Sequence, residues 1–146
     1  MIEAVGPVAL YGLHSVELAR LPVNGSILVP VFGRYCAPGR IILFEQPIAS
    51  WRLSGLLKGD VVRRMERAGA VLTWLNDVGA TLVDWPPNAL RRFMLEEVLL
   101  HELGHHVLQQ HKGKRADRIA RTRDHEAFAR RFAEKTRAAL KKGSFR

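Results

Sequence analysis

The first half of the chain carries short hydrophobic runs that are rich in β-branched residues and are separated by glycine and proline. Runs of this length and composition are typical of β-strands, because branched side chains pack well on a pleated surface. The pattern predicts strands at residues 7–13, 26–32 and 40–44. We expect these strands to form part of a small, mostly antiparallel sheet.

A helix and a hairpin are predicted next along the chain. The helix covers residues 60–67, with Asp60 as its N-cap because a carboxylate accepts hydrogen bonds from the first free backbone N–H groups. Gly69 is expected to end it, since glycine readily adopts the left-handed conformation that follows many helices. Two further runs, at residues 70–75 and 80–85, flank a short polar turn and predict a β-hairpin.

The spacing of hydrophobic residues becomes helical in the second half of the chain. Residues 89–110 contain no proline and a single glycine, Gly104, and they predict one long helix that ends before Lys112. A final helix is predicted to begin near Asp124. It carries a stripe of hydrophobic side chains, Phe128, Ala129, Phe132 and Ala133. A sheet followed by two helices predicts an α+β fold, and we expect one domain over residues 1–146.

Composition and charge narrow the class of protein. The single cysteine, Cys36, excludes an intramolecular disulfide and a zinc site built from cysteines alone. We see no signal peptide and no window hydrophobic enough to span a membrane, so we expect a cytoplasmic protein. The net charge of +9 lies in residues 112–146, which hold 13 Lys and Arg against 4 Asp and Glu. They include a basic tail from about residue 136.

That basic region has two interpretations. It is either a solvated helix face or a surface that contacts nucleic acid or an acidic partner. We favour the solvated face, because no aromatic side chains that would stack on bases alternate with the charges.

The motif that carries chemistry is His101-Glu102-Leu103-Gly104-His105, an HExxH sequence inside the predicted long helix. Two histidines four residues apart lie nearly above one another on a helix, so both can ligate one Zn²⁺. Glu102 then lies beside the metal, where it can act as general base toward water. The surrounding residues are hydrophobic, and burying these polar groups without a ligand would be unfavourable. We expect Gly104 to allow close approach of a neighbouring strand.

Catalytic zinc generally has three protein ligands, so a third residue is needed. His111 has the spacing of metzincin-like proteases, but no helix breaker precedes it, and a continuing helix turns it away from the pair. Glu126 and His125 lie on the next predicted helix, after a gap that suits a loop and an antiparallel return. Small residues around Glu126 would let the helices approach closely. We therefore choose Glu126, with His125 and His111 as alternatives.

Residues 95–135 resemble the gluzincin metallopeptidases, particularly the short single-domain minigluzincins and the ImmA/IrrE-like proteases. The resemblance rests on HELGHH followed by EAFARRFA. It implies a zincin-like fold with one zinc ion, held by His101, His105 and Glu126, and Glu102 as catalytic base. The chain departs from larger members by lacking an asparagine before Glu126 and a second catalytic domain. The group that stabilises the oxyanion is therefore open among His125, Tyr11 and Tyr35.

Two functions follow from these features. The first is a zinc endopeptidase that hydrolyses a peptide or protein substrate, bound in extended form along an edge strand at residues 80–85. The alternative is a zinc-stabilised binding module that contacts nucleic acid or an acidic partner through its basic C-terminal region. Glu97, one turn before His101, is expected either to hydrogen-bond a ligand or to be a solvated helix residue.

Overall fold

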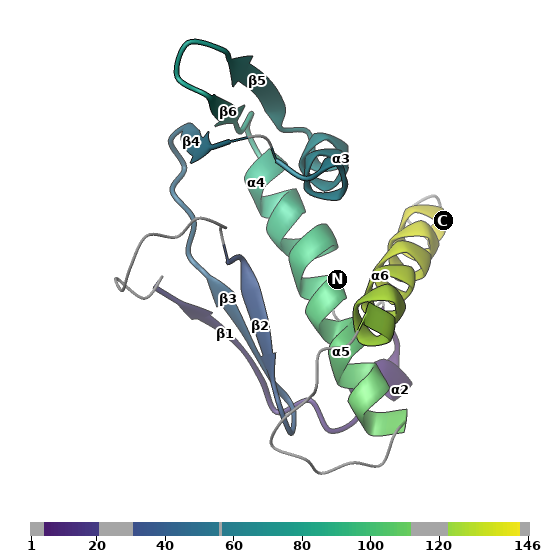
Figure 1. The fold of residues 1–146 in the computed structure, drawn as a ribbon. Coiled ribbons are helices and arrows are strands. Elements are labelled where there is room, and N and C mark those ends of the chain that lie inside the picture. Colours follow the sequence, from purple (N-terminus) through teal and green to yellow (C-terminus); the bar gives the residue numbers. More distant parts are fainter. Residues whose placement is uncertain (1–4, 21–30, 56, 112–122, 144–146) are drawn as a thin grey trace.

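The computed structural model of the protein describes residues 5–20, 31–55, 57–111 and 123–143. The described chain has an α+β fold with two three-stranded sheets and a set of helices packed beside them (Figure 1). The helical elements are α2 (Pro7–Leu10), α3 (Gly59–Ala68), α4 (Ala89–Arg92), η1 (Phe93–Leu99), α5 (Leu100–His111) and α6 (Arg123–Gly143). The strands are β1 (Ser15–Ala19), β2 (Gly33–Cys36), β3 (Arg40–Phe44), β4 (Trp51–Ser54), β5 (Val71–Leu75) and β6 (Ala80–Asp84).

The first sheet has the strand order β1-β3-β2, with β1 parallel and β2 antiparallel to β3. The strand predicted at residues 40–44 is confirmed as β3. The strand predicted at residues 7–13 is wrong, because this segment begins with the short helix α2. Pro7 lies at the start of that helix, where its missing N–H costs no hydrogen bond. Most of the strand predicted at residues 26–32 lies outside the described residues.

The second sheet has the order β4-β6-β5, and both of its ladders are antiparallel. The predicted hairpin is confirmed as β5 and β6. Because β6 is the central strand, it has no free edge, and the expectation that residues 80–85 bind substrate as an edge strand is wrong. The mostly antiparallel character is confirmed, although the strands form two sheets rather than one.

Helix α3 agrees with the helix predicted at residues 60–67, with a different N-terminus. Lys58 occupies the N-cap position without a side-chain cap hydrogen bond, so the prediction of Asp60 as N-cap is wrong. Asp60 lies in the first turn and pairs instead with Arg130 of α6, at 3.0 Å. Gly69 ends the helix in the left-handed conformation, with φ of 101°, as predicted.

The predicted long helix is one continuous helical segment made of α4, η1 and α5, and η1 has π-helical hydrogen bonding. Its inner face forms the centre of the core, where Phe93, Leu99, Leu100 and Leu103 are almost completely buried. Helix α6 begins at Arg123, close to the predicted start near Asp124, and it packs beside α5 (Figure 1). None of the described helices is both long and apolar enough to cross a membrane.

Candidate metal centre

Three side chains from two helices converge beside the start of α5. The Nε2 atoms of His101 and His105 lie 3.2 Å apart. Glu126 of α6 places one carboxylate oxygen 3.2 Å from the His101 Nε2 atom and the other 3.4 Å from that of His105. Within the described ranges, these three residues form the group of side chains able to hold a metal ion.

The distances in this group are in the range expected between ligands of one zinc ion. With zinc–nitrogen and zinc–oxygen bonds of about 2.0–2.1 Å, neighbouring ligand atoms of a tetrahedron lie about 3.3 Å apart. The two Nε2 atoms are 3.2 Å apart, and each faces a different Glu126 oxygen, at 3.2 Å for His101 and 3.4 Å for His105. Two histidines and a carboxylate are also a ligand set found in catalytic zinc sites, which keep a fourth position open.

Hydrogen bonding among the three groups does not by itself account for this arrangement. Each imidazole Nε2 has one position in the ring plane, which is either a donor or an acceptor. The Nε2 atoms of His101 and His105 nevertheless each face the other ring and a Glu126 oxygen. A cation shared by all three would satisfy every contact at once. The donor set therefore fits a bound zinc ion.

Access to the group is from one side. The side chain of His105 is 2% exposed and that of His101 12%, whereas Glu126 is 34% exposed. The histidines are thus fixed by packing in the core, and the carboxylate faces the solvent. An open side is what a substrate requires in order to reach a catalytic metal.

The close packing of α5 on α6 brings Glu126 to the histidines. A Cβ atom added to Gly104 would lie 2.6 Å from the Cα atom and 3.0 Å from the carbonyl oxygen of Ala129. Ala129 itself is completely buried. The expected close approach at Gly104 is therefore confirmed, but the neighbour is a helix rather than the strand that we predicted.

The predicted general base, Glu102, is held between α5 and the first sheet. Its side chain is buried, and its Oε2 atom accepts a 2.7 Å hydrogen bond from the backbone N–H of Tyr35 in β2. This contact joins residues that are far apart in the sequence. It fixes the direction of the carboxylate next to His101.

The alternative third ligands differ in position. Helix α5 continues through His111, as expected without a breaker, and the His111 side chain lies outside the described residues. His125 lies next to Glu126 on α6 but is not part of the described group. Of the alternatives whose side chains are described, the structure therefore brings Glu126, and not His125, to the pair.

In the described structure, neither of the two tyrosines considered for the oxyanion makes a hydrogen bond from its hydroxyl to the metal group. Tyr11 is 76% exposed, beyond the end of α2. The Tyr35 ring packs against His106, with ring centroids 5.7 Å apart, and its hydroxyl is buried without a hydrogen-bond partner in the described structure. Burial raises the pKa of the Tyr35 hydroxyl. These positions therefore do not favour either tyrosine as the group that stabilises the oxyanion.

His106 is a buried histidine that the sequence analysis missed. Its Nε2 atom lies 2.9 Å from the carbonyl oxygen of Tyr11, and its side chain is completely buried. Desolvation lowers the His106 pKa, the hydrogen bond to Tyr11 opposes this shift, and the neighbouring His14 adds to it. His106 therefore holds the segment after α2 onto α5. Its position directly after His105 gave no separate signal in the sequence.

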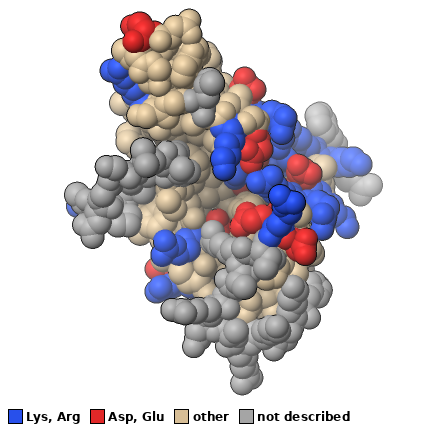
Figure 2. All heavy atoms as spheres, in the orientation of Figure 1, with Lys and Arg blue, Asp and Glu red and all other residues tan. Residues whose placement is uncertain are grey.

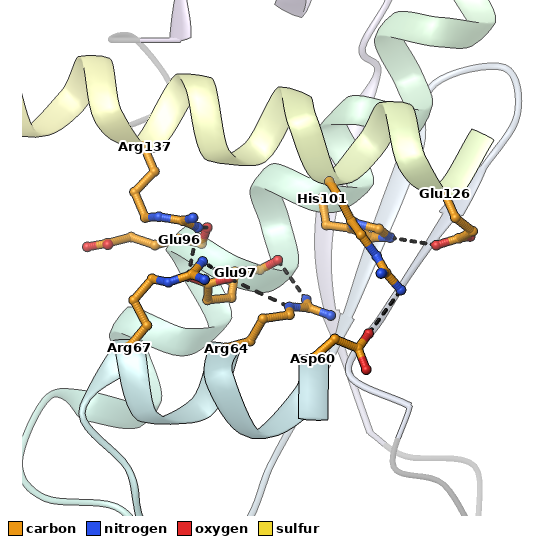
Figure 3. Close-up of polar contacts among 9 residues, drawn as sticks. Asp60, Arg64, Arg67, Glu96, Glu97, His101, Glu126 and Arg137 are labelled. Carbon is orange, nitrogen blue, oxygen red and sulfur yellow. Dashed lines mark hydrogen bonds and ion pairs between the residues drawn. The ribbon is translucent and has the colours of Figure 1, made fainter. Parts of the chain in front are cut away.

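Glu97 is the centre of an ion-pair cluster one turn before His101 (Figure 3). Its buried carboxylate lies 2.7 Å from Arg137 of α6, 3.3 Å from Arg67 and 3.6 Å from Arg64, both of α3. We name these four residues the Glu97 cluster. The expectation that Glu97 is a solvated helix residue is wrong, because the arginines cover it.

The Glu97 cluster also satisfies backbone groups of η1. Arg64 donates to the Glu97 carbonyl oxygen at 2.9 Å, and Arg137 donates to that of Glu96 at 3.3 Å. These contacts fix the π-helical segment directly before His101. Such segments often occur at functional sites.

Comparisons of the chain with protein-family models, with curated proteins and with solved structures find no match.

Proposed function

We propose that the protein is a zinc metallopeptidase of gluzincin type, in which His101, His105 and Glu126 hold the metal. The observation that carries the proposal is the convergence of the two imidazole Nε2 atoms and the Glu126 carboxylate, with contacts of 3.2–3.4 Å. Two features add support. The group is open on the Glu126 side, and a carboxylate that is not part of the ligand set, Glu102, directly follows His101.

Each residue of the site has a separate role in this proposal. Zinc, when bound, supplies Lewis acidity toward a peptide carbonyl and toward water. Glu102 takes the proton from the attacking water and returns it to the leaving amine. The Tyr35 N–H keeps the Glu102 carboxylate in one orientation, so that the base is in place before substrate arrives. Glu102 is not needed to hold the metal, so a carboxylate at this position favours a catalytic over a purely structural zinc site.

The test combines metal content with hydrolysis. We expect one equivalent of zinc in the wild-type protein, measured by plasma mass spectrometry, and cleavage of an unfolded protein such as casein. Glu102→Gln should keep the zinc and lower the rate by about 10²–10⁴-fold, the usual contribution of a general base. Glu66→Gln, on the exposed face of α3, is the matched control and should be fully active.

Two results would contradict the proposal. The first is wild-type protein that binds no zinc even after reconstitution, because the ligand geometry would then serve another purpose. The second is full hydrolysis by Glu102→Gln, which would remove the base from the mechanism.

A further inference from the structure

A cavity of about 120 Å³ lies between α3 and α6, directly beside the metal group. Five arginines and three carboxylates contribute to its walls, together with His101 and Ala133. They are Arg63, Arg64, Arg67, Arg130, Arg137, Asp60, Glu97 and Glu134. We name it the arginine cavity. Its volume is many times the ~10–15 Å³ that one water molecule occupies, so a small polar group fits inside.

The charges around the arginine cavity do not balance. Five guanidinium groups face three carboxylates, an excess of two positive charges. Asp60 pairs with Arg130, whereas Glu97 alone faces three arginines. Arg63 makes no ion pair with any residue in the described part of the chain. Figure 2 shows the resulting concentration of basic side chains, with acidic ones among them, on the side of the molecule formed by α3 and α6.

Two of these arginines are largely removed from water, whereas Arg63, Arg67 and Arg130 are exposed. The side chain of Arg137 is 9% exposed and that of Arg64 is 25% exposed. Desolvation lowers the pKa of Arg64, Glu97 opposes this shift, and the nearby Arg130 adds to it. Arg137 and Arg64 share one counter-ion, the Glu97 carboxylate, and two largely buried positive charges against one negative charge are unfavourable. An anion in the arginine cavity would neutralise positive charge that Glu97 and Asp60 leave unbalanced.

The arginine cavity lies next to the proposed site of peptide hydrolysis. His101 belongs both to the wall of the cavity and to the metal group. A peptide with its reacting carbonyl at the metal would therefore place a neighbouring group in the cavity. The anionic groups of an unmodified peptide are carboxylates, and the planar guanidinium group pairs with carboxylates through two parallel hydrogen bonds.

We infer that the arginine cavity is a subsite that binds a carboxylate of the substrate, an inference that rests on the proposed peptidase function. The carboxylate belongs either to an Asp or Glu side chain or to the C-terminus of the peptide. Both sources present the same group to the arginines. The subsite would make acidic peptides the preferred substrate class.

Three short peptides separate these sources. Acetyl-Ala-Glu-Ala amide carries only a side-chain carboxylate, acetyl-Ala-Gln-Ala acid carries only a C-terminal one, and acetyl-Ala-Gln-Ala amide carries none. Binding is followed through the arginine side-chain N–H signals in ¹H–¹⁵N NMR spectra of the full chain, with and without zinc. We expect at least one carboxylate peptide to bind about 10-fold more tightly than the neutral peptide, as a charge-assisted contact allows.

Substitutions of single arginines test whether the carboxylate peptide binds in the arginine cavity. Arg63→Gln removes a guanidinium group that makes no ion pair in the described structure, so the fold should be unaffected. Arg67→Gln leaves Glu97 paired with Arg64 and Arg137. Each should weaken binding of the carboxylate peptide about 3–5-fold, the effect of one partly exposed charge pair. The control is Arg52→Gln on β4, an exposed arginine outside the cavity, which should not change binding.

The possible outcomes test the carboxylate subsite independently of the proposed peptidase function. Binding of only the Glu peptide assigns the subsite to acidic side chains, and binding of only the free acid assigns it to C-terminal carboxylates. Equal binding of all three peptides, or the same loss in Arg52→Gln as in Arg63→Gln, would overturn the inference. Carboxylate binding without any hydrolysis would keep the anion site and remove the peptidase, because the NMR measurement requires no turnover.

Discussion

Two polar clusters lie one helical turn apart on the same segment, and both involve α6. In the metal group, His101, His105 and Glu126 direct electron-donating atoms toward a common point. In the Glu97 cluster, one carboxylate is surrounded by three guanidinium groups. The first arrangement lacks positive charge at its centre, and the second has more positive charge than Glu97 neutralises.

This difference separates groups that stabilise the fold from groups that bind a ligand. Glu97 makes ion pairs with both α3 and α6, so it holds these helices to η1 whether or not a ligand is present. Glu126 is one-third exposed, and its contacts with the histidines are those a metal ion would replace. Removing Glu97 should therefore affect folding, whereas removing Glu126 should affect metal binding.

The largest effect is expected for Glu97→Gln. Loss of this buried charge leaves Arg137 and Arg64 without their counter-ion, and breaking a buried pair in this way costs about 3–5 kcal/mol. The free energy of unfolding, from urea titration monitored by circular dichroism, should fall by that amount. Glu134→Gln is the matched control, since this exposed residue also contributes to the arginine cavity. Equal destabilisation by both would contradict the assignment.

The second effect is expected in metal affinity. Glu126→Ala removes a proposed ligand and should lower zinc affinity by at least ~100-fold, since changes outside the ligand shell already cost 10–100-fold. Competition with a chromophoric chelator measures the zinc affinity of each protein. Zinc should raise the melting temperature of the wild type and not of Glu126→Ala, because ligand binding stabilises only the state that binds. Loss of zinc in His125→Ala or His111→Ala, with retention in Glu126→Ala, would reassign the third ligand.

Local sequence patterns predicted much of the fold and most of the candidate metal group. Strand β3, the β5–β6 hairpin and the end of α3 at Gly69 follow from short stretches of sequence. The convergence of His101 and His105 follows from the helical repeat alone. The choice of Glu126 needed one further step, the small residues that allow α6 to approach α5.

The missed features depend on residues far apart in the chain. Glu97 meets arginines from 30 or more positions before it and 40 after it, and no local pattern signals these contacts. The division of the strands into two sheets, with β6 central in one, likewise depends on long-range pairing. The π-helical segment was not predicted because its hydrophobic spacing resembles that of an α-helix.

The third effect tests the packing that the two clusters share. In Gly104→Ala the new Cβ would overlap the backbone of Ala129, so α5 and α6 must separate. We expect a loss of about 1–3 kcal/mol in the free energy of unfolding, as for other overpacked sites. Zinc affinity should also fall, because Glu126 moves with α6. Gly59→Ala is the matched control, since an added Cβ there meets no atom within 4 Å.

The smallest effect is expected for Arg67→Gln, which tests how exposure divides the arginines of the Glu97 cluster. Arg67 and Arg137 contact the same Glu97 oxygen, but their side chains are 37% and 9% exposed. Water screens the Arg67 pair, so its loss should lower the free energy of unfolding by about 0.5 kcal/mol. Arg137→Gln should cost several times more, because it also removes the bond to the Glu96 carbonyl oxygen. Equal losses, measured side by side in urea titrations, would mean that the cluster acts as one unit. Excess positive charge would then be a structural requirement rather than a feature available to a ligand.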